Sequence, residues 1–245
     1  MQTQFQPSSF RPASLVAAAL TAMLTLVLAS AVLAQPSADS LIFPPTDKPF
    51  GQSYAKWSEE WWQWALALPV EGHPFSKHGF DCNSANNGQG GPVWFLALSP
   101  MPPQVKRSCT IPADTAVFLG LPNVECSDLE VPLFPQGTGA KTPSEQRECA
   151  EEFADHIVVS SLFCTLDGKA VANNLGSFRF QSSPFTFIAP TPWIFGATGG
   201  TGKAVSDGYF VMLKPLSSGI HTLSCGGEFD FGFGVGNTYH LTVEE

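Results

Sequence analysis

Four of the six tryptophans of this chain lie in the stretch from Ser53 to Pro69 (SYAKWSEEWWQWALALP). At about 100° per residue, one face of a helix in this stretch carries five large side chains: Tyr54, Trp57, Trp61, Trp64 and Leu68. Trp62 widens the apolar arc beyond the stripe of an ordinary surface helix, so one packing partner would not cover it. Pro69 ends the helix because proline has no N–H to donate. We therefore predict an aromatic helix that is packed on two sides and anchors the core.

The N-terminal segment, residues 1–34, has the pattern of an export signal. Arg11 supplies a positive charge, residues 15–28 are apolar, and small residues offer a cleavage site after Ala31 or Ala34. An uncleaved anchor is the alternative, because the apolar run is almost long enough to span a bilayer. We expect cleavage, since small residues crowd the end of the run and no basic residue follows it. The chain is thus predicted to be exported, to the periplasm or the medium.

The charge of the remaining chain bears on its partners. Residues 1–34 hold one Arg and no acidic residue, so 11 basic and 21 acidic side chains remain, a formal charge of −10. Nucleic acids and anionic lipids are bound by clusters of Lys and Arg, and an acidic excess argues against both. No second apolar stretch is long enough to cross a membrane. We expect a soluble protein with no membrane contact after signal cleavage.

Cysteine usage indicates crosslinks rather than metal or redox chemistry. All six cysteines follow the signal: Cys82, Cys109, Cys126, Cys149, Cys164 and Cys225. An even number in an exported chain predicts three disulfides, for which 15 pairings are possible. No C-x-x-C motif is present, which weakens the zinc and the thioredoxin-like alternatives. We expect neither a metal nor a cofactor.

Turn signals and short apolar runs predict a mainly β fold, a β-sandwich or jelly roll with the aromatic helix at its N-terminus. The chain has 22 Gly and 21 Pro, a composition typical of many short strands joined by tight turns. Thr142-Pro143-Ser144-Glu145 is a capping box that predicts a second, short helix. Asp167-Gly168 predicts a two-residue hairpin. Residues 35–52 are interpreted as an extended lead-in and residues 53–245 as a single domain.

Particular segments carry more specific expectations. Val93–Leu98 (VWFLAL) is predicted to be a strand buried on both faces. Thr115–Leu121 is predicted to be a strand that ends at a long loop, residues 122–141. Ala197–Lys203 (ATGGTGK) is interpreted as a Gly-rich loop without the spacing of a phosphate-binding motif. The alternation of Phe and Gly over residues 229–235 predicts a strand with one bare face.

The residues able to perform acid–base chemistry are few. His73 and Asp81 lie in the long loop after the aromatic helix, and Glu125 has apolar neighbours in sequence. These three are the candidate catalytic residues, on the hypothesis that the loop faces Glu125. The alternatives are a loop histidine that only forms hydrogen bonds and a buried structural carboxylate. No G-x-S-x-G motif is present, which disfavours a standard α/β-hydrolase.

Several motifs are distinctive when taken together: Trp61-Trp62-Gln63-Trp64, Gly91-Pro92-Val93-Trp94-Phe95-Leu96, Cys109-Thr110-Ile111-Pro112-Ala113, Asp167-Gly168, Arg179 with Ser183-Pro184-Phe185, Ser206-Asp207-Gly208-Tyr209 and Leu213-Lys214-Pro215-Leu216. From the aromatic helix to its end, the chain resembles an uncharacterised family of exported bacterial proteins. That family has no assigned activity, so the resemblance implies no catalytic residue. Cys164 and Cys225 stand where it implies apolar residues, which favours a bond between these two.

The pairing hypothesis follows from these points. Besides Cys164–Cys225, it joins Cys82 to Cys109, which ties the Gly- and Asn-rich loop across the strand at residues 93–98. It also joins Cys126 to Cys149, which fixes the long loop at residues 122–141 to the second helix. We expect the Cys164–Cys225 bond to connect distant parts of the sheet.

Two classes of function are compatible with this sequence. The first is a binding module for a glycan or a protein of the cell envelope or medium, with Trp193 and Tyr209 as exposed aromatic contacts; the alternative interpretation makes both rings part of the core. The second is a hydrolase or lyase acting on an extracellular polysaccharide or ester through His73, Asp81 and Glu125.

Overall fold

The computed structural model describes residues 41–82, 88–130, 140–196 and 198–244. The predicted signal, residues 1–34, and the start of the lead-in lie outside the described residues. In the part that is described, no helix is long and apolar enough to cross a membrane. The lead-in is more than an extended segment, because Ile42 is buried and forms a bridge with Leu213, and a 3-10 helix spans Pro49–Gly51 (η1).

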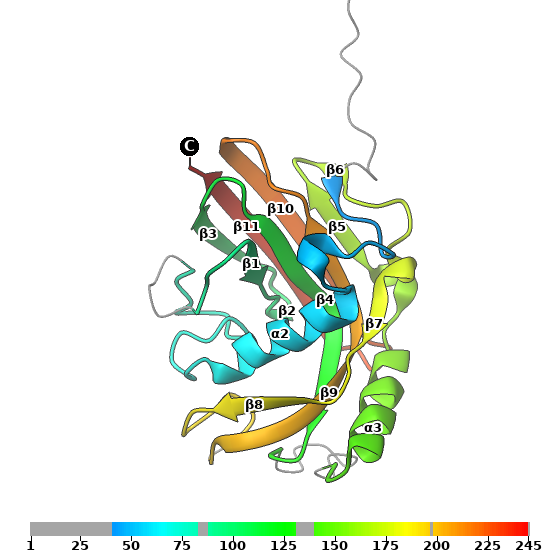
Figure 1. Cartoon of the computed structure of the whole chain (residues 1–245). Coiled ribbons are helices and arrows are strands. Elements are labelled where there is room, and N and C mark those ends of the chain that lie inside the picture. The colour runs from blue at the N-terminus through cyan, green and yellow to red at the C-terminus, as the bar shows by residue number, and fades with distance from the viewer. Residues whose placement is uncertain (1–40, 83–87, 131–139, 197, 245) are drawn as a thin grey trace, which may run out of the picture. The chain divides into compact units, whose positions relative to one another are not determined.

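Two β-sheets form the described core (Figure 1). Sheet A has the strand order β1–β4–β9–β7, and β8 also pairs with β9. Its strands span Val93–Leu96 (β1), Ala116–Ser127 (β4), Arg179–Gln181 (β7), Phe185–Ala189 (β8) and Gly200–Leu213 (β9). Sheet B has the order β2–β11–β10–β5–β6, and β3 runs parallel to β11. Its strands span Pro100–Met101 (β2), Val105–Ile111 (β3), Phe163–Leu166 (β5), Lys169–Ala170 (β6), Gly219–Glu228 (β10) and Gly234–Val243 (β11).

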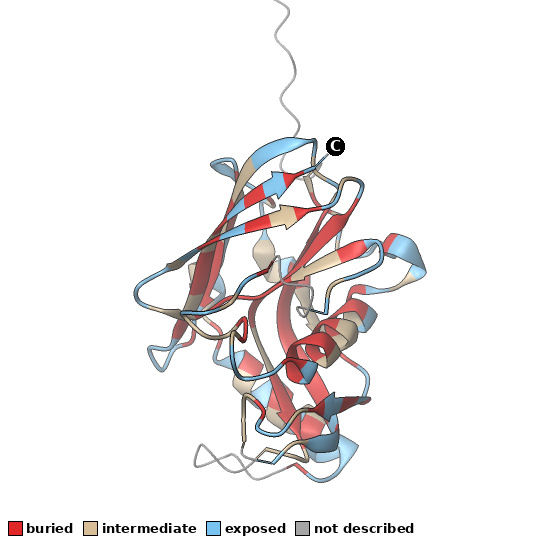
Figure 2. Cartoon of the chain, turned by 90° about the vertical axis from the view of Figure 1, so that its left-hand side faces the viewer, coloured by how far each residue is buried: buried red, intermediate tan, exposed pale blue. Residues whose placement is uncertain are grey.

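The helices complete the layers and confirm the predicted mainly β, sandwich-like fold. Helix α2 (Tyr54–Ala67) begins after the N-cap Ser53 and packs against β4, β7, β8 and β9 of sheet A, while β4 also contacts β10 and β11 of sheet B. Helix α3 (Pro143–Asp155) begins with the predicted capping box and packs against β4 and β9. Short 3-10 helices span Val159–Ser161 (η2) and Leu175–Phe178 (η3). Figure 2 shows that buried residues concentrate in the strands and on one side of α2, while exposed residues gather in the turns.

Helix α2 is packed on two sides, as its wide apolar arc predicts. Toward sheet A, the Trp61 indole N–H donates to the Leu96 carbonyl at 2.8 Å, and the Trp61 ring contacts Phe210. On another side, Trp62 contacts Phe75 and Phe195, with ring centroids 5.8 and 6.5 Å away. Burying such rings contributes about 1.5–3 kcal/mol each. The helix is therefore a main source of the stability of the fold.

Strand β4 is longer than its sequence predicts. The loop expected at residues 122–141 starts only after Ser127, because β4 continues through Pro122. The pairing with β9 shifts between Gly120 and Asn123, and this bulge accommodates a proline that has no N–H for the ladder. Strand β1 is shorter than expected: it ends at Leu96, and because it is an edge strand of sheet A, Trp94 and Phe95 are only half-buried.

Two other segments also differ from expectation. The Gly-rich segment at residues 197–203 is not all loop, since β9 begins at Gly200 and pairs with β8. The segment 229–235 is largely a turn, in which the Phe229 N–H donates to the Phe233 carbonyl at 2.7 Å. Its Phe residues alternate because their rings pack on one another, with Phe229 and Phe231 centroids 5.2 Å apart, and not because the backbone is a strand.

Local turn and strand signals are confirmed elsewhere. Asp167 and Gly168 both have positive φ, 51° and 77°, and join β5 to β6 as a two-residue turn. In β11, Tyr239, Leu241 and Val243 are buried, while the intervening His240 is exposed.

The structure contains the three predicted disulfides, Cys82–Cys109, Cys126–Cys149 and Cys164–Cys225. The second bond joins β4 to α3. The third does not connect distant parts of a sheet as expected, because Cys164 and Cys225 lie directly opposite each other on the neighbouring strands β5 and β10. Three disulfides indicate a protein that folds in an oxidising compartment.

The double variant Cys164→Ala/Cys225→Ala should remain folded but melt at a lower temperature. Strands β5 and β10 keep their backbone pairing from Leu166–Leu223 to Phe163–Gly226, so the fold does not depend on the bond. Removal of the crosslink should cost about 2–4 kcal/mol. Calorimetry and circular dichroism measure both effects, and non-reducing peptide mapping of the parent checks the pairing. A variant that melts like the parent would show the bond to be without effect on stability.

Gly120→Ala should destabilise the protein by about 1–3 kcal/mol. A Cβ at Gly120 would lie 2.6 Å from the Asn123 side-chain nitrogen and 3.0 Å from the Trp61 ring, so both side chains would have to shift. Gly90→Ala is the matched control, because a Cβ there meets no atom within 4 Å. Denaturant unfolding of both variants gives the comparison, and equal stabilities would contradict the close contact of α2 with β4.

Candidate functional site

A cavity of about 230 Å³ lies at the bulge of β4, where α2, the ends of β2 and β11 and four connecting segments meet. We call it the aromatic cavity. Its lining residues are Trp61, Trp62, Phe75, Leu98, Pro100, Gly120, Leu121, Asn123, Phe195, Phe233 and Val235. The volume is smaller than that of a typical drug-sized pocket and suits a single ring.

The walls of the aromatic cavity are preformed by contacts among the rings. Phe75 stacks on Phe195 with centroids 6.1 Å apart, and Trp62 meets Phe75 edge to face. Phe233, from the turn before β11, is 43% exposed and gives the cavity a side that faces solvent. A ligand would therefore enter between rings that are already in place.

Two polar atoms of lining residues are buried and have no hydrogen-bond partner among the described residues: the Trp62 indole N–H and the Asn123 side-chain oxygen. The Asn123 amide nitrogen donates to the Leu121 carbonyl, which fixes the orientation of the amide group. Leaving such groups unpaired costs about 1–3 kcal/mol each. A hydroxyl group both donates and accepts, so it is a chemical match for either atom.

The bulge of β4 puts Asn123 at this position. Gly208 of β9 stands opposite Asn123 with φ at +139°, and a Cβ there would lie 2.4 Å from the Asn123 Cα. Only glycine combines this backbone conformation with so close an approach. The sequence signal Ser206-Asp207-Gly208-Tyr209 thus includes a residue that shapes the cavity wall.

The candidate catalytic residue His73 is buried and forms structural hydrogen bonds. Its Nε2 lies 2.9 Å from the Ala65 carbonyl near the end of α2, and its Nδ1 accepts from the Phe75 N–H at 3.1 Å. Burial lowers the pKa of His73 to about 4. The hydrogen bond to the Ala65 carbonyl opposes this shift, and the positive charge of Arg107 increases it. The ring is neutral and helps to hold Phe75 in the cavity wall. Asp81, in contrast, is exposed.

Glu125 lies on β4 beyond the bulge, and both its carboxylate oxygens are buried with no partner among the described residues. Burial raises the pKa of Glu125 well above its ordinary value, and the charges of Glu130 and Asp128 raise it further. The neighbours of Glu125 are thus acidic, whereas those of His73 are Ala65, Phe75 and Arg107. No described hydrogen bond or ion pair joins His73, Asp81 and Glu125, and their catalytic role stays a prediction.

The expectation that Trp193 and Tyr209 are exposed contacts is wrong, because the rings are only 2% and 4% exposed. Trp193 stacks on Phe187 with centroids 5.7 Å apart and meets Phe195 edge to face at 5.6 Å. It therefore supports a wall of the aromatic cavity from behind. Tyr209 pairs with Arg179 between β9 and β7. Both are core residues, the alternative that the sequence left open.

Sequence reasoning missed the residues that line the aromatic cavity. The sequence presents Trp62 only as part of a wide helical arc, although an arc too wide for one packing partner is also a signal of a ring available to a ligand. Asn123 was assigned to a loop because Pro122 precedes it, and the bulge that turns it toward the cavity has no signature in a single sequence.

The fold should lose stability as the pH rises, because Glu125, which is buried, and Glu130, which is half-buried, both have a raised pKa. Burial raises the pKa of Glu130 from 4.5 to about 7, against a hydrogen bond from the Ser127 N–H that lowers it. Because the pKa of each group is higher in the folded state, its stabilising effect is complete at a pH below the pKa of the unfolded state. This effect is lost as the pH rises through the pKa of the folded state. Each group contributes a slope of at most about 1.4 kcal/mol per pH unit.

Glu125→Gln/Glu130→Gln should therefore flatten the decline in melting temperature between pH 5 and pH 8. His73 contributes the opposite slope between about pH 4 and 6.5, so the variant is compared with the parent at each pH. Glu148→Gln, on the exposed face of α3, is the control and should leave the slope unchanged. Identical slopes in the parent and the double variant would contradict the raised pKa of these two acids.

Comparison with known proteins assigns no activity to these residues: no protein-family model, no curated protein and no solved structure matches this chain.

Proposed function

We propose that this protein is an exported binding module that holds one hydroxyl-bearing ring, such as a single sugar unit of a glycan, in the aromatic cavity. The observation that carries the proposal is the pair of buried, unpartnered groups on lining residues, the Trp62 N–H and the Asn123 oxygen. Aromatic faces pack against the C–H face of a sugar, and the two polar atoms would select for a hydroxyl. Both features of the cavity thus favour the same ligand class.

A glycan is favoured over a protein partner by the shape and size of the site. A protein interface of ordinary strength buries about 800 Å² on each partner, whereas this cavity has a volume of about 230 Å³. Its lining residues carry no charged side chain, which favours a neutral ring over an acidic or basic one. Export and the oxidising compartment indicated by three disulfides are consistent with a ligand of the cell envelope or medium.

The hydrolase hypothesis at His73, Asp81 and Glu125 has less support. A general base needs a free nitrogen within reach of its proton, and both nitrogens of His73 take part in structural hydrogen bonds. Glu125 has acidic neighbours and no described contact with His73.

Binding should be detectable by saturation-transfer NMR and by quenching of tryptophan fluorescence with a panel of neutral monosaccharides, followed by a glycan array. Trp62→Phe keeps a ring but removes the N–H, so the Kd of the best ligand should rise about 10-fold. Asn123→Ala should weaken the same ligand by a similar factor, because the acceptor is lost.

Trp94→Phe is the matched control. The Trp94 N–H is also buried without a described partner, but Trp94 does not line the cavity. Its removal should leave the Kd unchanged. If Trp62→Phe and Trp94→Phe bound the ligand equally well, the ligand would not occupy this cavity. A panel and an array without any binder would overturn the proposal.

A further inference from the structure

The aromatic cavity adjoins a group of phenylalanine rings in the turn between β10 and β11, residues 229–233, which we call the aromatic turn. Phe233 lines the cavity, and Phe231 is 58% exposed. The buried Phe229 ring contacts both, with its centroid 5.2 Å from that of Phe231 and 5.9 Å from that of Phe233. The aromatic surface of the cavity thus continues outward through this turn.

Backbone hydrogen bonds fix the aromatic turn in place. The Phe229 N–H donates to the Phe233 carbonyl, and the Gly232 N–H donates back to the Phe229 carbonyl at 3.0 Å. The Asp230 N–H donates to the carbonyl of His156, at the end of α3, at 2.9 Å. Because the turn is tied to itself and to α3, its exposed rings are already positioned, and a ligand would spend little free energy on ordering them.

The direction in which the aromatic cavity opens is given by the exposure of its lining residues. Phe233 is the one exposed residue among those that line it, and all the others are buried or half-buried. A chain whose first ring fills the cavity would therefore leave it past Phe233. The volume of about 230 Å³ holds one ring, so the second unit of a longer ligand would lie outside, on the aromatic turn.

Polar groups flank the exposed ring of Phe231. The His156 ring meets Phe231 edge to face at 5.8 Å, and His156 Nδ1 lies 3.0 Å from the Asp230 carboxylate. Both polar side chains are exposed. A carboxylate accepts several hydrogen bonds, so Asp230 can accept from a ligand hydroxyl while it stays paired with His156. An apolar ring beside such acceptors suits a sugar unit, which has a C–H face and a rim of hydroxyls.

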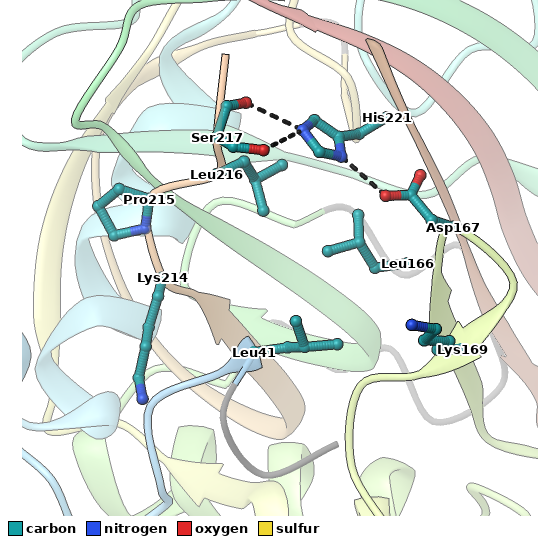
Figure 3. A pocket seen from close by; sticks show the side chains of 9 residues that line it. All are labelled: Leu41, Leu166, Asp167, Lys169, Lys214, Pro215, Leu216, Ser217 and His221. Atoms are coloured by element: carbon teal, nitrogen blue, oxygen red, sulfur yellow. Dashed lines mark hydrogen bonds and ion pairs between the residues drawn. The ribbon is translucent and has the colours of Figure 1, made fainter. Parts of the chain in front are cut away.

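A second cavity, of about 260 Å³, offers no comparable site (Figure 3). Its polar groups are paired with one another: His221 Nδ1 lies 2.8 Å from the Asp167 carboxylate, and Nε2 lies 2.9 Å from the Ser217 carbonyl. Lys169 and Lys214 also line it. This cavity therefore has neither the unmatched polar atoms nor the uncharged lining of the aromatic cavity.

We propose that the aromatic turn is a second subsite and that the ligand of this protein is an oligosaccharide. Its terminal unit occupies the aromatic cavity, and the next unit packs on Phe231 with a hydroxyl directed to Asp230. This inference rests on the proposed function of the aromatic cavity. It adds the length of the ligand, the direction of its chain and the residues that recognise the second unit.

The affinities of short saccharides test the second subsite. The neutral monosaccharide that the parent binds best is compared, by calorimetry, with disaccharides that carry the same unit at the non-reducing end in different linkages. The parent should bind at least one disaccharide about 5-fold more tightly, the scale of one aromatic packing contact. In saturation-transfer NMR, protons of both sugar units should receive saturation.

Phe231→Ala should remove this gain and leave the Kd of the monosaccharide unchanged, because Phe231 does not line the cavity. Phe231→Tyr keeps a ring and should keep the gain. Phe50→Ala is the matched control: Phe50 is 47% exposed, contacts two other rings and lies outside the cavity lining. It should bind both saccharides like the parent. Trp62→Phe should weaken both by the same factor, and melting curves confirm that each variant is folded.

The outcomes separate this inference from the proposed function. A parent that binds no saccharide would overturn both. A parent that binds the monosaccharide but no disaccharide more tightly, or a Phe231→Ala variant that keeps the gain, would overturn the second subsite alone. Phosphatidylcholine vesicles are a further probe. Vesicle binding that is lost in Phe231→Ala, without a gain for any disaccharide, would assign the aromatic turn to a lipid surface and likewise overturn the subsite.

Discussion

The contact between Trp61 and Gly120 is the constraint on which the rest of the fold depends. Gly120 allows the indole ring to lie directly on β4, and the ring then reaches the Leu96 carbonyl of β1 and the Phe210 ring of β9. A larger side chain at residue 120 would force the Trp61 ring to shift. Sheet A also packs on sheet B through β4, so this contact lies on the strand that joins the two sheets.

A second, polar contact holds the connecting segments against this frame. Arg107 on β3 is 8% exposed, and it has no ion-pair partner in the described part of the chain. Its guanidinium instead donates to the Ser76 carbonyl, the Ser99 hydroxyl and the Tyr239 hydroxyl, and lies 4.8 Å from the Phe80 ring centre. A buried charge is tolerable only when its donors are satisfied. The segment that carries Phe75 is thereby fixed, and with it one wall of the aromatic cavity.

The sequence predicted elements whose signals are local and missed those that depend on distant neighbours. Helix α2, the capping box of α3 and the Asp167-Gly168 turn are each specified within a few residues, and all three are present. The bulge at Pro122 depends on pairing with β9, more than 80 positions later, and no periodicity reveals it. The same holds for both cavities, whose lining residues come from segments far apart in sequence. The burial of His73 likewise depends on Ala65 and Arg107 as well as on Phe75 of its own loop.

The aromatic cavity lies where regular strand pairing stops, and there is a physical reason for this. Inside a paired sheet, the backbone groups of neighbouring strands satisfy one another. At the bulge of β4, the ladder is interrupted, so Asn123 can present a side-chain oxygen that the fold itself does not use. Such unmatched groups destabilise the fold, so they are tolerated only when other contacts provide extra stability. The four tryptophans of α2 and the three disulfides supply this extra stability. They thereby allow the fold to tolerate unmatched polar groups where strand pairing is interrupted.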